Sequence, residues 1–348
     1  MQYTQRLRQQ LGLLALPFVC ALGISLPSAS QAETLNIYSA RQEALIKPLL
    51  DRFTDETGIG VNLVTGGGDA LITRLMTEGR NSPADILLTV DAGRLYRARE
   101  AGVLQPVESD TLRDAIPANL RSPDNLWYGL SVRARVLAVD PERVDVSALK
   151  DYEDLAAPEW KGRICVRSSD NIYNQSLVAG MLAQKDTKEV EAWLKGLVGN
   201  LARRPQGGDR DQIKAVASGQ CDVALVNSYY FGAMLQSDNA EERQVAESLQ
   251  LLWPNQDNRG AHINISGAGV TRASSQPDLA LRLLEFLIRE DSQRWYAETN
   301  NEYPVREGVS SSRLLQSWGE FKADPLDVSE LGRLNAQAVM AMDRANWK

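Results

Sequence analysis

The sequence predicts an α/β protein of two lobes, each a central, mostly parallel sheet flanked by helices, with a ligand cleft at the hinge. Strand and helix patterns alternate along residues 34–101, which is typical of a parallel sheet with crossover helices. A similar alternation returns over residues 162–226. The 348 residues, of which 43% are hydrophobic, are enough for two cores of ~100–200 residues each.

The chain is expected to divide into four segments. Their bounds are residues 1–32 for a secretory signal, 33–132 for the first segment of lobe 1, 133–258 for lobe 2, and 259–348 for a return to lobe 1 and the C-terminal helices. In the signal, Arg6 and Arg8 precede an apolar stretch, and the small residues Ser30 and Ala32 fit a peptidase site. Cleavage there gives a mature chain that begins near Glu33. The alternative is an uncleaved anchor helix, for which the apolar run is short.

The first lobe is predicted as alternating strands and helices. Runs rich in β-branched and aromatic residues predict the strands, and apolar residues at helical spacing predict the helices. Between a strand and a helix, Gly66-Gly67-Gly68-Asp69 forms either a plain turn or an anion cradle. In order, the predicted elements are Thr34–Ser39, Glu43–Thr57, Gly60–Thr65, Asp69–Gly79, Ala84–Val90 and Ala92–Ala101.

The second lobe follows an extended segment, Tyr128–Val139, and again alternates strands with helices. Its predicted elements are the strand Gly162–Val166, the helices Ile172–Gln184, Thr187–Leu201 and Asp209–Ser218, and the buried strand Asp222–Val226. The stretch Pro254–Gly269 returns to a short strand, and helices follow near Pro277–Arg289, Ser292–Thr299 and Leu331–Arg344. We expect this tail to dock on the first lobe. The chain then crosses between the lobes at least twice, which makes a hinge and a cleft.

Charge and cysteine usage restrict the partners and the chemistry. The net charge is −7, and removing residues 1–32 takes away two arginines and no acid, which leaves −9. An acidic chain argues against nucleic acid or an anionic membrane as partner. After the signal, Cys165 and Cys221 remain as either one disulfide or two buried thiols. There is no Cys or His cluster with zinc spacing, and the lone His262 is interpreted as a packed polar residue.

Motifs of known catalytic types are missing from the sequence. It has no Gly-x-Ser-x-Gly elbow, no Walker loop, no Gly-x-Gly-x-x-Gly after a strand, and no His to act as a base beside a nucleophile. We therefore expect a binding protein rather than an enzyme.

Three tyrosines follow the strands of the second lobe. Tyr229 and Tyr230 come where the strand Asp222–Val226 ends, and Tyr173 follows the strand Gly162–Val166. Binding sites in open α/β sheets lie at the carboxyl ends of strands, so the three phenols are expected to converge on the cleft. Taken alone, a Tyr-Tyr pair is more often a packing pair with solvated hydroxyls.

A cluster of phenols indicates a specific kind of cation. Phenols keep their protons at neutral pH because their pKa is about 10, so several phenolates together need a strong cation. Fe(III) is hard, trivalent and oxygen-seeking, and three phenolates neutralise it and discriminate against Mg, Ca and soft metals. The cluster therefore predicts a ferric site.

The chain resembles the ferric-ion-binding periplasmic proteins of bacterial iron ABC transporters, which have the type II periplasmic binding fold. The resemblance covers almost the whole mature chain. It is carried by Asn36-Ile37-Tyr38-Ser39-Ala40-Arg41, Ser131-Val132-Arg133-Ala134-Arg135-Val136, Tyr152-Glu153-Asp154-Leu155, Trp160-Lys161-Gly162, Asn171-Ile172-Tyr173-Asn174-Gln175, Asn227-Ser228-Tyr229-Tyr230 and Asn301-Glu302-Tyr303-Pro304-Val305.

The resemblance implies that Tyr173, Tyr229 and Tyr230 ligate the iron. Many members carry His-Tyr, two further ligands, directly after the arginine equivalent to Arg41, where this sequence has Gln42-Glu43. Glu43 is a candidate fourth ligand, either directly or through water. The alternative is a first-turn glutamate that favours the helix N-terminus.

The resemblance also implies a synergistic anion such as carbonate beside the metal. Arg133 matches the region that holds it, and Arg41 is a second candidate, because a guanidinium fork suits a bidentate anion. The alternative for Arg133 or Arg135 is an ordinary salt bridge on the strand between the lobes.

The expected function is capture of Fe(III), bare or as a small ferric chelate, by a monomer in the periplasm that delivers it to an inner-membrane ABC permease. One alternative keeps the fold and changes the ligand to a small organic solute such as a polyamine or a phosphorylated compound. A second alternative is a secreted hydrolase with two carboxylates in the cleft.

Overall fold

Eight strands form one hydrogen-bonded network in residues 33–348, the part of the chain that the computed structural model describes. The predicted signal at residues 1–32 lies outside the described residues. The strand order is β2-β1-β3-β8-β4-β6-β5, and β7 pairs with β4. The strands are β1 Thr34–Ser39, β2 Gly60–Thr65, β3 Ile86–Val90, β4 Tyr128–Val139, β5 Ile164–Cys165, β6 Val223–Asn227, β7 Gln250–Leu252 and β8 Ile263–Val270.

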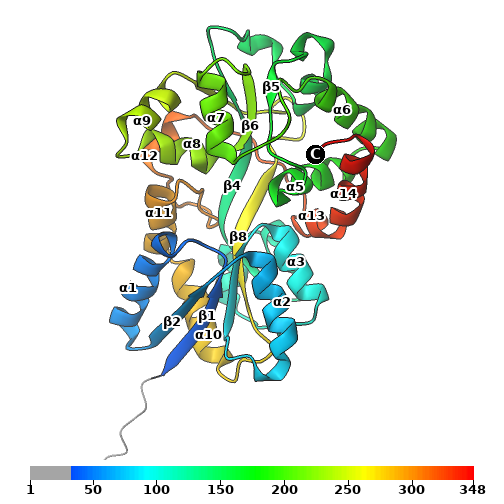
Figure 1. Cartoon of the computed structure of the whole chain (residues 1–348). Helices are drawn as coiled ribbons and strands as arrows, with labels where there is room; N and C mark the ends of the chain where they lie inside the picture. The colour runs from blue at the N-terminus through cyan, green and yellow to red at the C-terminus, as the bar shows by residue number, and fades with distance from the viewer. Residues whose placement is uncertain (1–32) are drawn as a thin grey trace, which may run out of the picture. The chain divides into compact units, whose positions relative to one another are not determined.

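Two long strands, β4 and β8, run between the two halves of this network (Figure 1). We call the part around β1, β2 and β3 the first half and the part around β5, β6 and β7 the second half. The beginning of β4 pairs with β8, and its end, from Arg135 onward, pairs with β6 and β7. The two strands approach closely where Gly267 pairs with Gly129, because a Cβ on Gly267 would lie 2.7 Å from the Tyr128 carbonyl oxygen. The predicted double crossing is therefore made by β4 and β8.

The helices are α1 Lys47–Thr57, α2 Gly68–Glu78, α3 Ala92–Glu100, α4 Asp110–Ala115, α5 Ile172–Leu182, α6 Thr187–Gly199, α7 Asp209–Ala217, α8 Ser228–Leu235, α9 Ala240–Glu247, α10 Pro277–Leu287, α11 Glu290–Thr299, α12 Arg313–Ser317, α13 Ser329–Arg333 and α14 Asn335–Arg344. Most of the predicted helices lie within a few residues of their ranges, the predicted helix Leu331–Arg344 is divided into α13 and α14, and α4, α8, α9 and α12 had no predicted range. None of the helices in residues 33–348 combines the length and apolar character needed to cross a membrane.

One predicted helix, Glu43–Thr57, is divided in the structure. A 3₁₀ turn, Glu43–Leu45, precedes α1, and Ile46 between them has φ −144°. Pro48 follows in the first turn of α1, where its missing N–H and fixed φ are compatible with a helix start but not with an uninterrupted helix through Glu43. The helix therefore starts four residues later than predicted.

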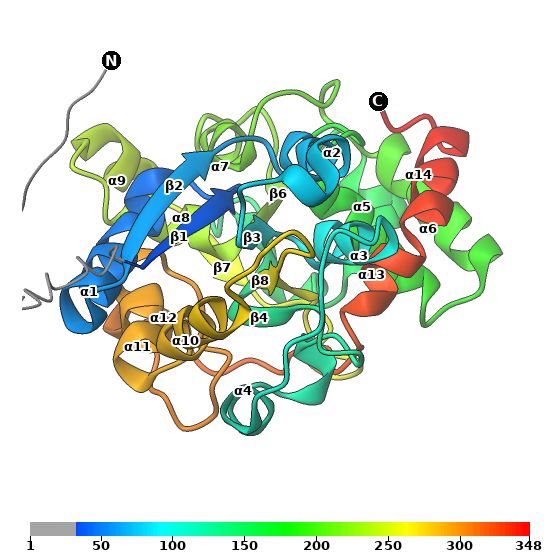
Figure 2. The same cartoon turned by 90° about the horizontal axis from the view of Figure 1, so that it is seen from below.

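The C-terminal helices differ from the expectation that the tail docks on the first lobe. Helix α10 packs against α1, α4 and β8, whereas α13 contacts both α3 and α5. Helix α14 packs on α5 and α6, and Figures 1 and 2 both show it beside helices of the second half. Its apolar side chains, among them Ala338, Ala341 and Met342, belong to the core cluster that also contains Val178 and Leu194. The last helix therefore covers the second half.

The two cysteines left open by the sequence are joined. Cys165 at the end of β5 and Cys221 just before β6 form a disulfide, with their Cα atoms 5.9 Å apart. Both residues are buried. The disulfide thus links the two neighbouring strands that lead to the three tyrosines.

Candidate metal centre

The three tyrosines lie in the first turns of two helices that follow adjacent strands. Strands β5 and β6 are parallel neighbours, with Ile164 paired to Val223. Helix α8 begins at Ser228, directly after β6, and carries Tyr229 and Tyr230. Helix α5 carries Tyr173, whose backbone N–H donates to the side chain of its N-cap, Asn171. Because parallel strands end at the same edge of a sheet, both helix starts meet there.

The phenol groups are in contact. The Tyr229 hydroxyl donates a hydrogen bond to the Tyr173 hydroxyl, with 3.3 Å between the oxygens. The rings of Tyr229 and Tyr230 are 4.2 Å apart between centroids, with an interplanar angle of 35°. The predicted convergence of three phenols is therefore present in the structure.

The surroundings favour protonated phenols in the absence of a cation. Burial raises the pKa of Tyr229 well above its ordinary value, and its neighbours Tyr173 and Tyr230 raise it further, whereas Arg133 lowers it. Burial, with the nearby Tyr173 and Asp209, raises the pKa of Tyr230 to about 12. A cation that binds here must displace the phenolic protons.

A cavity of about 210 Å³ adjoins the tyrosines. The second half contributes the three tyrosines, Arg210 and Ala233, and β4 contributes Arg133. The first half contributes Ala40, Arg41, Gln42, Leu45 and Val90, and the end of α11 with the segment after it contributes Thr299, Asn300 and Glu302. The phenols therefore face side chains from the opposite half across one cavity.

Arg133 is a buried cation beside the phenols. Its Cζ atom lies 5.6 Å from the ring centre of Tyr173 and 5.7 Å from that of Tyr229. One Nη donates to the Ile265 carbonyl oxygen at 2.7 Å, and Nε has no hydrogen-bond partner in the described residues. Burial disfavours its charge, but Tyr229, Tyr173 and Glu302 raise its pKa on balance. Arg133 is thus a charged side chain that lines the cavity and is hydrogen-bonded to a carbonyl oxygen rather than to a carboxylate, as suits an anion contact.

Arg41, the second predicted anion contact, is already engaged in the structure. It is 4% exposed. Its guanidinium fork donates to both carboxylate oxygens of Glu302, at 3.0 and 3.1 Å, and one Nη also donates to Ser266. Although burial acts to raise the pKa of Glu302, Arg41 and Arg133 lower it on balance. With Arg41 holding Glu302, Arg133 is the better placed of the two arginines for an anion.

The structure brings Gln42, rather than Glu43, to the cavity. Glu43 is exposed on the 3₁₀ turn before α1 and does not line the cavity, whereas Gln42 does. Ligation by Glu43 stays a prediction.

Sequence reasoning gave no site role to Glu302, Arg210 or Asn300, which also line the cavity. Glu302 occurs in a motif that carried the resemblance. Its partner Arg41 is 261 residues away along the chain, so no local pattern could have shown the pair.

The other polar candidates have structural partners. Arg135 makes a salt bridge with Asp209, which is the alternative considered for it. Asp69, after the triple glycine, pairs with Arg94 and Arg97. Burial, with nearby arginines, lowers the pKa of His262 to about 3, as fits a packed neutral imidazole.

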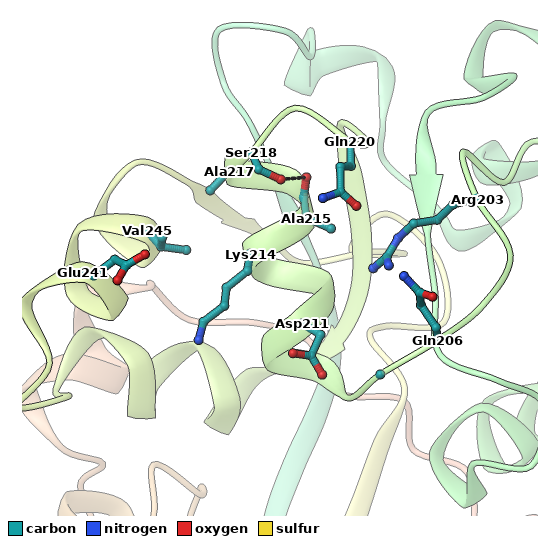
Figure 3. A pocket seen from close by; sticks show the side chains of 11 residues that line it. Arg203, Gln206, Asp211, Lys214, Ala215, Ala217, Ser218, Gln220, Glu241 and Val245 are labelled. Atoms are coloured by element: carbon teal, nitrogen blue, oxygen red, sulfur yellow. Dashed lines mark hydrogen bonds between the residues drawn. The ribbon is translucent and has the colours of Figure 1, made fainter.

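A larger concavity, of about 670 Å³, lies on the outer side of α7 (Figure 3). Its Lys214 is paired with Glu242 at 2.8 Å, and no tyrosine lines it. Within residues 33–348, no group of three or more His, Cys, Asp or Glu residues could hold a metal. The phenol cluster is therefore the candidate metal centre of this part of the chain.

Two α/β halves joined by crossing strands, with polar groups facing each other over a cavity between them, define a solute-binding protein. Residues 81–322 match the model of the bacterial extracellular solute-binding protein family, and the chain belongs to this family.

Relatives share nearly the full length of the chain. Iron uptake protein A1 of Synechocystis sp. is 45% identical over 318 residues, which is 91% of this chain and 88% of the relative. The Fe(3+)-binding periplasmic protein of Serratia marcescens is 31% identical over 322 residues, 92% of each chain.

Solved structures agree with these relatives. A Trichodesmium protein (IdiA, FutA), solved in complex with iron and citrate ligands, is 49% identical with a TM-score of 0.88, and the alignment covers 90% of this chain and all of that one. Apo FutA2 of Synechocystis is 46% identical with a TM-score of 0.86, covering 91% of this chain and all of that one. The predicted two-lobed type II periplasmic binding fold is confirmed by these neighbours.

Proposed function

We propose that this protein captures Fe(III) in the periplasm with Tyr173, Tyr229 and Tyr230 and delivers it to an ABC permease for iron uptake. The observation that carries the proposal is the convergence of three phenols on one cavity between the two halves. Three phenolates supply three negative charges on hard oxygen donors, which balance one ferric ion. Relatives named for iron uptake and for Fe(3+) binding support the same ligand.

The remaining coordination positions and the charge balance favour a small anion beside the metal. Three phenolates neutralise Fe(III), so the charge of Arg133 stays uncompensated within the site, whereas the other two arginines of the lining are paired, Arg41 with Glu302 and Arg210 with Glu242 at 3.5 Å. A cavity of about 210 Å³ has room for a small anion in addition to one metal ion. The relative solved with iron and citrate supports a small ferric chelate as the captured species. Gln42, Glu43 or water would complete the shell.

The location and the partner follow from the same family. The Serratia relative is named a periplasmic protein, and the predicted signal at residues 1–32 supports export of this chain. The disulfide between Cys165 and Cys221 is consistent with an oxidising compartment. We propose a monomeric carrier that binds and releases iron at an inner-membrane ABC permease without catalysing a reaction.

A ferric titration of the purified, metal-free protein tests this function. We expect a broad visible band from phenolate-to-iron charge transfer that grows with added ferric citrate and saturates at about one equivalent, because phenolates bound to Fe(III) donate electron density to it. Ferric citrate without protein is the control. A protein that develops no such band does not hold iron through tyrosinates, and a small organic solute would then be the better ligand.

Iron affinity is expected to fall as the pH falls. The raised pKa values of Tyr229 and Tyr230 mean that the free protein keeps these phenols protonated at neutral pH, so capture must release their protons. A lower pH makes protons better competitors for the same oxygens. We expect roughly two to three protons released per ferric ion in a lightly buffered titration, after subtraction of the protein-free blank. Saturation without proton release would contradict tyrosinate binding.

A further inference from the structure

A buried carboxylate, Asp209, lies behind the three tyrosines. It is the first residue of α7 and is 1% exposed. One carboxylate oxygen accepts hydrogen bonds from Arg135 Nη1 at 2.7 Å and from the Asn227 backbone N–H at 2.9 Å. The other oxygen accepts from Arg167 Nη1 at 2.7 Å. Asp209 therefore joins α7, strand β4, the turn after β5 and the end of β6.

The same network reaches the first turn of each helix that carries a candidate ligand. Arg135 donates to the Asn174 side-chain oxygen at 2.5 Å and to the Asn227 side-chain oxygen at 3.2 Å. Asn174 is the neighbour of Tyr173, and Asn227 is the N-cap of α8, two residues before Tyr229. Both tyrosine-bearing helix starts are thus tied, through Arg135, to one carboxylate.

Asp209 also determines where two cations lie. Arg135 is 1% exposed, and such a charge is strongly disfavoured away from water unless it is paired. Arg167 has its Cζ atom 5.6 Å from the ring centre of Tyr173, so its charge acts on the phenol cluster. A change at Asp209 would remove the carboxylate that is paired with both guanidinium groups.

We propose that Asp209 is the positioning residue that holds Tyr173, Tyr229 and Tyr230 in the arrangement that Fe(III) needs, an inference that rests on the proposed function. A metal site binds tightly when its donors are held in place before the ion arrives, because less freedom is then lost on binding. Groups that orient metal ligands typically change metal affinity by about 10- to 100-fold when removed. No hydrogen bond joins Asp209 to a donor oxygen in the described residues, so it positions the phenols through Arg135, Arg167 and Asn227. Its charge also acts directly on Tyr229 and Tyr230.

The test compares Asp209→Asn with Asp211→Asn in the purified protein. Asp209→Asn keeps the shape of the side chain and removes its charge. We expect ferric affinity, measured by competition with citrate, to fall by roughly 10- to 100-fold. The maximum of the phenolate-to-iron band should also move, because the donor geometry and the position of the Arg167 charge change. Global destabilisation alone would reduce the amplitude of the band and leave its maximum in place.

Asp211 is a matched control on the same helix. It is exposed, accepts a hydrogen bond from the Gly208 backbone N–H at 2.7 Å, and lies on the side of α7 that lines the outer concavity (Figure 3). Its replacement weakens the start of α7 without touching Arg135 or Arg167. We expect Asp211→Asn to bind iron like the wild type. An equal loss in both variants would assign the effect to α7 itself and overturn the proposal.

A second variant, Asn174→Ala, covers the case in which Asp209→Asn fails to fold. It removes the side-chain oxygen on α5 that accepts from Arg135, together with two hydrogen bonds from Asn174 to the Arg167 and Ser168 carbonyl oxygens, and leaves Asp209 with both arginines. A weaker affinity with a displaced band supports the positioning role. The positioning role is overturned if Asn174→Ala, and any Asp209→Asn protein that folds, bind iron with wild-type affinity and an unmoved band. The proposed ferric function would still stand in that case. If the wild type itself shows no band, the proposed function fails, and the positioning role fails with it.

Discussion

Replacing Tyr229 by Phe is expected to lower the ferric affinity by more than about 100-fold, beyond the range seen when only supporting groups are removed. The change deletes one of three phenolate donors and leaves one positive charge of the ion unbalanced in a buried site. The ring itself still packs on Tyr230, so the fold should be retained. Competition with citrate gives the affinity, and the visible band should lose intensity. Tyr230→Phe and Tyr173→Phe are expected to act in the same direction.

Tyr303→Phe is the matched control for this series. Tyr303 is a tyrosine whose hydroxyl has no hydrogen-bond partner among the described residues, and it does not line the cavity. Its replacement should leave both the affinity and the band unchanged. If Tyr229→Phe also binds iron with wild-type affinity, the phenol cluster is a packing cluster and the ferric site lies elsewhere or is absent.

Removing the disulfide is expected to lower the free energy of unfolding by ~3–4 kcal/mol, because the bond between Cys165 and Cys221 closes a loop over 56 residues of sequence separation. Strand β5 pairs with β6 at only two residue pairs, so few backbone hydrogen bonds hold these strands together once the disulfide is removed. The variant is Cys165→Ala with Cys221→Ala, since alanine leaves no unpaired polar group at these buried positions. Urea unfolding of the metal-free protein gives the change.

A reductant provides the control for this measurement. It should destabilise the wild type by a similar amount and leave the double alanine variant unaffected. Thiol counting must first show that the reductant has reduced the bond. If the wild type then unfolds at the same urea midpoint with and without reductant, the disulfide does not stabilise the fold.

Local sequence rules predicted the elements and the place of the phenols. Runs rich in β-branched and aromatic residues located β1 and β2 at their observed bounds, and the predicted extended segment Tyr128–Val139 is β4, because such preferences depend only on neighbouring residues. The convergence of Tyr173 with Tyr229 followed from one topological rule, that the ends of parallel strands share an edge. These inferences needed no knowledge of which helix packs on which face.

The missed features all depend on long-range packing. An amphipathic helix such as α14 shows which of its faces is buried but not which core receives it, and it packs on the second half rather than the first. Which side chain of the pair Gln42 and Glu43 reaches the cavity depends on the 3₁₀ turn before Pro48. Because α1 starts at Lys47 and not at Glu43, the 3₁₀ turn sets the directions of both side chains, and the sequence pattern could not predict which of the two faces the cavity.

The sequence by itself determined the fold class, the alternation of strands and helices, and the position of three tyrosines at strand ends, from which a ferric site is predicted. Only the tertiary structure decided which charged groups are paired and which remain available at that site. Arg41 is paired with Glu302 and Arg135 with Asp209, whereas Arg133 donates to the Ile265 carbonyl oxygen and forms no salt bridge among the described residues. The physical reason is that a charge can be buried only where a partner, distant in the chain, is brought within hydrogen-bonding distance, and folding alone establishes that distance.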